Sequence, residues 1–262
     1  MHCPTIDDLP SPAQLKSGWP WTEGSPVLPK LQANGKPWPK VSIVTPSYNQ
    51  GEYLEETIRS VLLQGYPNLE YIIIDGGSDD ASVEIIKKYS QWLTDWVSEQ
   101  DRGQTHAVNK GFDRCSGDIL AWMNSDDTYE PGAIAAAVQA MTHDSRVNVV
   151  YGNIKMTDGT GNILTELRSV PFHPQAFLYE TVHITSQSAV FWTRSLLLKV
   201  GMVKEELNYA MDRDLLIRFM EAGATFKFLR RTLGTYRCHC SAKSTSDASR
   251  KELLSLHQLA AI

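Results

Sequence analysis

Between residues 41 and 141 the chain alternates segments of two kinds, and this alternation constrains the fold more than any other feature. Short, continuously apolar segments such as VSIVTP, YIIID and DILAWM are typical of strands that are buried on both faces. Between them lie segments with apolar residues at helical spacing, for example Leu54, Ile58 and Val61 in the helix predicted at 51–65. This alternation predicts an α/β fold: a mostly parallel central sheet flanked by helices.

The second half of the chain has a less regular pattern. Two strand-like segments at 148–158 and 161–170 meet at a Gly-containing turn, which predicts a β-hairpin. A strand and a short helix follow at 188–201, and then an amphipathic helix at 211–223 and a final strand. We therefore predict a small additional hairpin subdomain beside the main sheet.

Charge and composition exclude several classes of protein. The net charge is −5, from 25 basic and 30 acidic residues, and no cluster of Lys and Arg marks a nucleic-acid surface. The first residues lack the basic and apolar regions of a secretory signal, and no apolar run approaches the roughly 18 residues that a membrane span requires. Four unevenly spaced cysteines are too few for a secreted disulfide scaffold. We expect a soluble, reduced, cytoplasmic protein, with peripheral contact at the inner face of the membrane left open.

The first 39 residues are rich in Pro, Gly, Ser and Trp and carry neither a helical nor a strand period. We predict an extended N-terminal arm over 1–39 whose Trp19, Trp21 and Trp38 pack on the domain. A partner-binding motif is the alternative interpretation. The C-terminal tail, 241–262, is polar at first and then weakly helical.

Polar residues follow four successive predicted strands at the point where each strand ends. They are TPSYN at 45–49, DGGSD at 75–79, DRG at 101–103 and NSDD at 124–127. In an open α/β sheet, ligands bind at the carboxyl ends of the strands. Each segment alone would be an ordinary turn, whereas four of them on one rim predict a binding site.

The residues of this rim narrow the choice of ligand. The turn after the first strand is not the G-x-G-x-x-G of dinucleotide folds, and the chain has no G-x-x-x-x-G-K-[ST] loop for a nucleoside triphosphate. Because the rim is acidic, a phosphorylated ligand would need a cation. Asp126 and Asp127 are hard oxygen donors that suit a divalent ion with phosphate oxygens in its shell. Turn formation alone is the other interpretation of these two acids.

Several motifs, in the same order, resemble glycosyltransferase family 2. They are VSIVTPSYNQGEYLEETIRSVLLQGYPNLEYIIIDGGSDD, DRGQTHAVNKGF and ILAWMNSDD. The resemblance spans about residues 40–240 and implies a GT-A fold and an inverting transfer of a sugar from a nucleotide-sugar. It implies a nucleotide-sugar-binding half at 40–130 and an acceptor-binding and catalytic-base half at 131–240.

The resemblance also implies which residues hold the nucleotide. In the family, the turn after the first strand, here Thr45, Pro46 and Tyr48, and the acid after the second strand, here Asp75, hold the nucleobase; we add Gly77 from the same rim. A carboxylate at position 75 fits uracil or thymine because it accepts their imide N–H. We therefore expect a UDP- or dTDP-linked sugar.

The family's acidic D-x-D motif binds the ribose and a Mn²⁺ or Mg²⁺ ion on the diphosphate. It corresponds here to the segment from Asn124 to Asp127, in which Asn124 replaces the first acid and Asp127 can supply the missing charge. We assign Asp126 to the metal or the ribose, and Asp127 to the metal or its water shell.

An inverting transfer requires a carboxylate that takes the proton of the acceptor hydroxyl during attack. Asp212 shares a helical face with the apolar stripe that begins at Leu215, so it is expected to point into the cleft, where the helix dipole would keep it ionised. It also matches the second acid of the family's E-D-x-D pattern, whose first acid is replaced by Met211. We predict that Asp212 is the base, with N-capping as the alternative role. Asp214, expected nearly opposite, is assigned to orienting the loop or the acceptor.

Further candidates surround these residues. Arg102 and Gln104 follow a strand end and are assigned to the diphosphate, with a surface position as the alternative for the arginine. His239 resembles the histidine of a late Y-R-x-H motif that approaches the diphosphate. The residues assigned to the acceptor side are Trp122, His183 and Gln187, with core packing as the alternative for the tryptophan.

Three functions from different classes follow. The leading hypothesis is a metal-dependent glycosyltransferase that acts on a glycan or lipid-linked acceptor in surface polysaccharide biosynthesis. A phosphatase with Asp75 as nucleophile would need a second Asp two residues later, where the chain has Gly77. A nucleotide-sugar-binding module without turnover is supported by Asn124 and Met211. The oligomeric state is not predicted.

Overall fold

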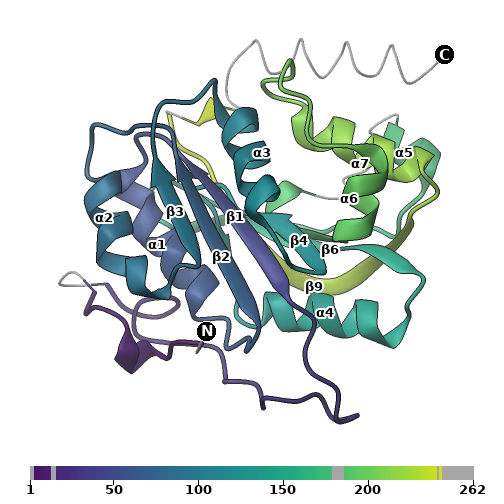
Figure 1. Cartoon of the computed structure of the whole chain (residues 1–262), viewed down its shortest axis with the longest axis horizontal. Coiled ribbons are helices and arrows are strands. Elements are labelled where there is room, and N and C mark those ends of the chain that lie inside the picture. Colours follow the sequence, from purple (N-terminus) through teal and green to yellow (C-terminus); the bar gives the residue numbers. More distant parts are fainter. Residues whose placement is uncertain (1–2, 13–15, 179–185, 241, 244–262) are drawn as a thin grey trace.

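The central sheet is built from the apolar segments that the sequence singled out. The computed structural model describes residues 3–12, 16–178, 186–240 and 242–243. Within these residues nine strands form one sheet in the order β3-β2-β1-β4-β8-β6-β9-β5, with β7 paired to β6 (Figure 1). The structure thus confirms an α/β fold with helices flanking a central sheet.

One half of the sheet is parallel. Its strands are β1 (Val41–Ser47), β2 (Leu69–Asp75), β3 (Asp95–Ser98) and β4 (Ile119–Trp122). They alternate with α1 (Gly51–Leu62), α2 (Ser82–Tyr89) and α3 (Gln104–Arg114), and a 3₁₀ turn covers Ser90–Trp92. Every residue of β1 is buried, because β1 lies between β2 and β4 with helices over both faces. This explains why apolar residues such as Ile43 and Val44 occupy both of its faces.

The other half of the sheet is mixed. Its elements are β5 (Thr128–Tyr129), α4 (Ala133–His143), β6 (Val147–Thr157), β7 (Ile163–Leu167), α5 (Pro174–Leu178), β8 (Val190–Thr193), α6 (Arg194–Val200), α7 (Met211–Glu221) and β9 (Thr225–Arg237). A 3₁₀ turn, Gln187–Ala189, precedes β8. β8 runs antiparallel to β4 and β6, whereas β9 runs parallel to β6. The predicted hairpin is β6–β7, and the short β5, which was not predicted, pairs with β9.

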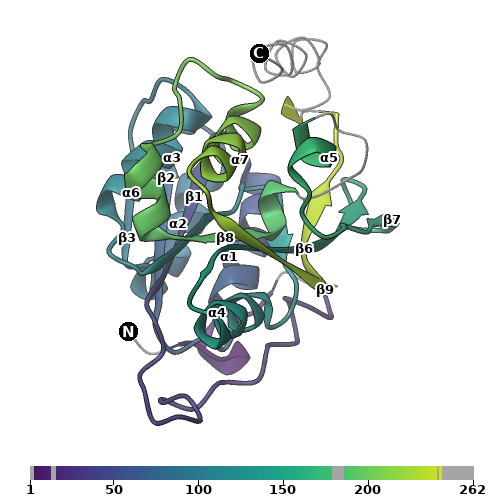
Figure 2. The same ribbon diagram turned by 90° about the vertical axis from the view of Figure 1, so that its right-hand side faces the viewer.

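Two apolar cores lie on the two faces of the sheet. One contains residues of α1, α2 and α4, including Leu54 and Ile134, and the other contains residues of α3, α6 and α7, including Val108 and Leu215. Figure 2 shows α4 on one side of the sheet and α7 on the other. Among the described residues, no helix combines the length and the apolar character that crossing a membrane requires.

The N-terminal arm packs on the domain, and Arg59 of α1 donates hydrogen bonds to its backbone. A 3₁₀ turn covers Ile6–Asp8, Trp21 and Trp38 are buried, and Nε1 of Trp19 donates a hydrogen bond to the backbone oxygen of Tyr129 over 2.8 Å. Gly65, which follows α1 with φ +65°, has no room for a side chain, since a Cβ there would lie 2.3 Å from the backbone oxygen of Pro26. The arm is therefore part of the folded domain.

The parallel half of the sheet determines where a ligand can bind. Ser47 at the end of β1 is in register with Asp75 at the end of β2, which is in register with Ser98 at the end of β3. The carboxyl ends of these strands therefore meet at one edge, as the polar segments of the sequence predicted.

Candidate active site

A cavity of about 830 Å³ opens at the carboxyl ends of the parallel strands. Its lining combines residues from the ends of β1, β2, β3 and β4 with residues from the start of α7. The lining residues that the sequence singled out for a role are Pro46, Tyr48, Gln104, Trp122, Asp126, Asp127, Gln187 and Asp212. Residues more than 160 positions apart along the chain are thus collected in one space.

One end of the cavity is formed by the turn after β1. Pro46 and Tyr48 line it, and the side chain of Tyr48 is 63% exposed, so its ring is available to a flat ligand. Thr45 is fully buried instead, and its hydroxyl forms a hydrogen bond of 3.0 Å with the hydroxyl of Tyr71. Thr45 therefore supports the turn from below.

Asp75 is positioned differently from the expectation that it would meet a ligand. It is fully buried, and its carboxylate accepts hydrogen bonds from the backbone N–H groups of Gly77 and Ser78 at 3.1 and 2.9 Å. The hydroxyls of Ser78 and Ser98 also donate to it, at 2.6 and 2.7 Å. This carboxylate holds the ends of β2 and β3 together, and it is enclosed too completely to act as the nucleophile of a phosphatase. Gly77 is exposed and serves as a donor in this turn.

The two acids of the NSDD segment lie in different environments. Asp127 is 2% exposed, whereas the side chain of Asp126 is 20% exposed. Burial and the neighbouring charge of Asp126 raise the pKa of Asp127 well above its ordinary value, and the backbone N–H and charge of Arg237 oppose this rise. Two carboxylates this close, one of them desolvated, form a site that a cation would stabilise.

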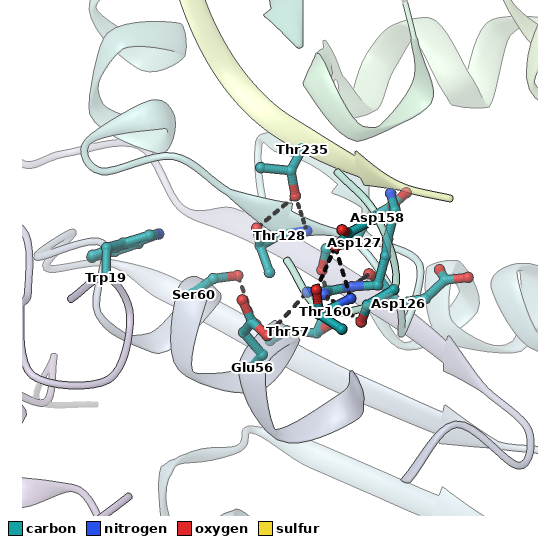
Figure 3. Close-up of polar contacts among 12 residues, drawn as sticks. Trp19, Glu56, Thr57, Ser60, Asp126, Asp127, Thr128, Asp158, Thr160 and Thr235 are labelled. Carbon is teal, nitrogen blue, oxygen red and sulfur yellow. Dashed lines mark hydrogen bonds and ion pairs between the residues drawn. The ribbon is translucent and has the colours of Figure 1, made fainter. Parts of the chain in front are cut away.

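The loop that carries these acids is held from two sides. On one side the hydroxyl of Thr57 in α1 donates to the backbone oxygens of Ser125 and Asp127, at 3.0 and 2.7 Å, and Figure 3 shows it directed at the loop. On the other side Nε of Arg237 donates to the backbone oxygen of Asp126 over 3.0 Å, and its Nη2 lies 3.0 Å from Glu56. The sequence did not point to Arg237, although it lies inside the late Y-R-x-H segment.

Asn124, the departure from D-x-D, has a structural explanation. Its Oδ1 accepts a hydrogen bond from Nε2 of Gln104 over 2.8 Å, and a hydrogen bond from its side chain lowers the pKa of Asp127. A carboxylate at position 124 could not donate this second bond and would add a third negative charge. The asparagine thus links α3 to the acidic loop.

The two carboxylates suit a divalent cation that takes most of its ligands from a bound phosphate group and from water. Asp126 and Asp127 offer carboxylate oxygens, and the described residues contain no group of three His, Cys, Asp or Glu side chains arranged to hold a metal on their own. A hard cation that keeps phosphate oxygens and waters in its shell needs only one or two protein carboxylates. The fit is therefore to a metal that is shared with a phosphorylated ligand.

Asp212 lines the same cavity from the first turn of α7. Its Oδ1 accepts the backbone N–H of Arg213 over 2.8 Å, whereas the N-cap of α7 is Ala210, so Asp212 does not have the N-capping role that was its alternative. Burial raises its pKa above the ordinary value, and this outweighs the backbone N–H groups and the charge of Arg213, which lower it. The start of the helix therefore does not offset the desolvation of this carboxyl group. Met211 beside it accepts a hydrogen bond from Thr105 at its sulfur.

Asp214 was expected on the face opposite Asp212, and the structure shows that it is buried between two basic side chains. It is 5% exposed and forms ion pairs of 2.7 Å with Lys204 and with Arg218. The guanidinium of Arg218 in turn donates to the backbone oxygens of Val200, Gly201 and Met202. Asp214 is thus positioned to orient the loop after α6, and two cations make its burial possible.

The remaining candidates lie in different surroundings. The guanidinium of Arg102 forms an exposed ion pair with Glu205 at 2.7 Å, whereas Nε2 of His239 lies 3.1 Å from Oδ2 of Asp126. Gln187 donates from Nε2 to the backbone oxygen of Trp122, and both residues line the cavity. His183 lies outside the described residues. Lining residues without a prior assignment include Gly76, Asp101, Asn208, Tyr209 and Lys243.

Residues 42–201 match the family described as Glycosyl transferase family 2. An uncharacterised glycosyltransferase of Mycobacterium tuberculosis is 32% identical over 183 residues, which cover 69% of this chain and 68% of that protein. The chondroitin synthase of Escherichia coli is 27% identical over 187 residues, which cover 71% of this chain and 27% of the synthase.

Two solved structures have a similar fold. The mannosyltransferase PcManGT of Pyrobaculum calidifontis, in complex with GDP-Man and Mn²⁺, has a TM-score of 0.67 at 19% identity over 92% of this chain and 68% of that one. S. aureus TarS in complex with UDP-GlcNAc has a TM-score of 0.63 at 18% identity over 84% of this chain and 66% of that one. At these identities the likeness concerns the fold alone.

Proposed function

The chain belongs to glycosyltransferase family 2 and has the GT-A fold, and on this premise we propose that it transfers a sugar from a nucleoside diphosphate sugar to a hydroxyl group with inversion. The observation that carries the proposal is the shared cavity, in which the acidic pair Asp126 and Asp127 and the helix-borne Asp212 are brought together. One end can take a nucleoside diphosphate, and the other offers a base to an incoming hydroxyl.

The nucleotide end is suited to a base, a ribose and a diphosphate in sequence. The exposed ring of Tyr48 can stack on a nucleobase, and we assign Asp126 and Asp127, which line the same cavity, to the ribose and diphosphate. Asp126 and Asp127 would hold a Mn²⁺ or Mg²⁺ ion, which supplies charge that stabilises the departing diphosphate. PcManGT, with GDP-Man and Mn²⁺ bound, is a precedent for this combination on the same fold.

The transfer itself requires one displacement. The oxygen of the acceptor hydroxyl forms a bond to the anomeric carbon while the bond from that carbon to the diphosphate oxygen breaks, and the electron pair leaves with the diphosphate. The carboxylate of Asp212 takes the hydroxyl proton. Its raised pKa suits this role, because a base with a pKa nearer to neutrality accepts a proton more readily.

The other side chains have supporting roles in this proposal. Gln104 and Asn124 hold the acidic loop to α3, and His239 contacts Asp126 from the side of β9. Gln187 and Trp122 line the same cavity, and we assign them to the acceptor side. Arg102 can reach the diphosphate only by leaving Glu205, so we give it no direct role.

The acceptor we propose is a glycan or a lipid-linked saccharide, in surface polysaccharide biosynthesis. The support is the chondroitin synthase of Escherichia coli, whose name describes polysaccharide synthesis, although the chain covers only 27% of it. A binding module without turnover is the second candidate function, and the replacement of the family's acids by Asn124 and Met211 favours it.

Release of nucleoside diphosphate tests the proposal. We expect release from one member of a panel of UDP-, dTDP- and GDP-linked sugars in the presence of Mn²⁺ and saccharide acceptors, and NMR of the product should show an inverted anomeric configuration. Binding of a nucleotide-sugar without release, for every donor and acceptor tried, would favour the module without turnover. Retention of configuration would contradict the single displacement.

A further inference from the structure

The turn after β2 presents bare backbone to the cavity at Gly76. A Cβ at this position would lie 2.8 Å from Oδ2 of Asp101 and 3.3 Å from Cδ2 of Tyr48. The carboxylate of Asp101 therefore lies directly over the backbone of Gly76, next to the ring of Tyr48. All three residues line the cavity at the end that we propose for the nucleobase.

Among the residues that the structure describes, one oxygen of this carboxylate accepts a hydrogen bond. Oδ1 of Asp101 accepts the backbone N–H of Gly103 over 2.7 Å, which fixes the orientation of the side chain. Within the part of the chain that the structure describes, no hydrogen-bond donor reaches Oδ2. An oriented carboxylate oxygen with free lone pairs is thus present beside an exposed aromatic ring.

Asp75, the neighbouring acid, cannot take this position. Its carboxylate is fully buried and already accepts four hydrogen bonds from Gly77, Ser78 and Ser98. Freeing it would separate the ends of β2 and β3. The turn thus contains one carboxylate that holds the fold and one that faces the cavity.

From these contacts we infer that Asp101 selects the nucleobase of the donor, an inference that rests on the proposed function. Oδ2 accepts the ring N–H of a base stacked on Tyr48. Uracil and thymine carry this N–H at N3 and guanine at N1, whereas cytosine has a lone pair at N3 and adenine one at N1. A carboxylate accepts hydrogen bonds and cannot donate them, so it favours the first three bases and disfavours the last two.

UDP and CDP are the sharpest pair of probes, because they differ only at the edge of the base that Asp101 would contact. We expect isothermal titration calorimetry with Mn²⁺ to show tighter binding of UDP than of CDP by the unmodified protein. Loss of one charge-assisted hydrogen bond corresponds to roughly tenfold to a hundredfold in affinity. In Asp101→Asn the amide oxygen can keep the hydrogen bond from Gly103 while the NH₂ group faces the base. The affinity for UDP should therefore fall by that factor, and the preference between the two nucleotides should shift toward CDP.

Two further variants complete the experiment. Asp79→Asn makes the same charge change on an exposed side chain of the same turn, and its preference for UDP should be unchanged. Gly76→Ala tests the geometry without altering Asp101, since the added Cβ would push Oδ2 aside. It should reduce the preference as Asp101→Asn does, and it supplies the answer should Asp101→Asn not fold.

The outcomes separate the two proposals. If Asp101→Asn and Gly76→Ala keep the unmodified ratio of UDP to CDP affinity, the inference is wrong and the proposed function is unaffected. An equal loss of affinity for UDP and CDP would indicate that Asp101 contacts the ribose, and this result would also overturn the inference. Should the unmodified protein bind no nucleoside diphosphate, the proposed function fails and the inference fails with it.

Discussion

The backbone N–H of Arg237 donates a hydrogen bond to Oδ1 of Asp127 over 2.9 Å, between residues 110 positions apart in the chain. The guanidinium of Arg237 extends over the same loop to the backbone oxygen of Asp126 and pairs with Glu56. The last residue of β9 thus fixes both acids of the proposed metal site, although we give it no contact with substrate. Positions that orient metal ligands affect metal affinity strongly when they are changed.

Arg237→Met should loosen this loop while keeping the backbone hydrogen bond. We expect the affinity for Mn²⁺ and nucleoside diphosphate to fall about tenfold or more. The free energy of unfolding should fall by about 3 kcal/mol, the lower end for a broken buried pair, because Glu56 is 24% exposed. Calorimetry and thermal melts measure both. Arg146→Met, which removes an exposed pair with Asp144, should change neither by much, and equal effects of the two variants would contradict the positioning role.

Asp212→Asn should abolish most of the transfer activity without weakening the binding of the nucleotide-sugar donor. We expect kcat to fall by roughly 10²–10⁴-fold, the usual range for loss of a general base, while the Kd of the nucleoside diphosphate stays the same. Glu221→Gln, at the far end of the same helix, is the matched control. Transfer that persists at the unmodified rate in Asp212→Asn would remove this residue from the mechanism.

The pH dependence of stability gives an independent measure of Asp212. Its folded-state pKa is raised by burial, whereas in the unfolded chain it titrates at about 3.9. The folded protein therefore holds the proton more tightly, so this contribution to stability is complete below the unfolded pKa and is lost as the pH rises through the folded pKa. Asp212→Asn should melt higher than the unmodified protein near pH 7.5 and show no such gain near pH 3.5. A gain of the same size at both pH values would show that charge burial is not the cause.

Activity should follow the same raised pKa. Because the proposed base must be ionised, kcat/KM should decline on the acid side at a pH above the ordinary Asp range. A pH–rate profile of the unmodified protein measures this limb. An acid limb at or below about pH 4, the ordinary range for Asp, would contradict the assignment of the base to a desolvated carboxyl group.

The sheet could be predicted from the sequence because burial leaves a direct mark on composition. Strands such as β1, buried on both faces, carry apolar residues on both faces, and the polar residues at their ends lie on the edge that they share. Asp126, Asp127 and Asp212, which the sequence placed at one site, line one cavity. The strand ends needed only local pattern, whereas the roles of these three acids also rested on the family resemblance.

Predictions that depended on the partners of one side chain were less accurate. Asp75 looked like a ligand-binding acid, but one of its partners, Ser98, comes from the next strand of the sheet. Asp214 was assigned to the loop or the acceptor without its ion-pair partners, because helical periodicity says nothing about the cations that reach it, and Lys204 lies in a separate loop. Such pairings are long-range, and no window of the sequence contains both members.

Arg59 gives a test of the N-terminal arm. It is fully buried in α1, and its guanidinium donates to the backbone oxygens of Pro10, Pro20 and Trp21 and to the hydroxyl of Tyr89, all at 2.8–3.0 Å. Arg59→Met would leave three carbonyl groups without this donor, each at a cost of about 1–3 kcal/mol if it stays buried. We expect the arm to become sensitive to limited proteolysis before the rest of the chain. Simultaneous cleavage of arm and domain would mean that they unfold as one unit.

Gln187 tests the proposed acceptor side. Its Nε2 donates to the backbone oxygen of Trp122, the last residue of β4, and this leaves Oε1 directed away from that bond. Within the described residues Oε1 is buried and has no hydrogen-bond partner, while the side chain lines the cavity. A buried acceptor without a donor is costly, and a sugar hydroxyl in the cavity would supply one.

Gln187→Met keeps the length of the side chain and removes both polar atoms. If Oε1 binds an acceptor hydroxyl, the KM for the acceptor should rise about tenfold or more, while hydrolysis of the donor by water and the Kd of the nucleoside diphosphate stay the same. Gln139→Met, on the exposed face of α4, is the control for the substitution itself. A rise in donor Kd with an unchanged acceptor KM would instead assign Oε1 to the donor sugar. A melting temperature lowered without any kinetic change would mean that the side chain only supports the carbonyl of Trp122.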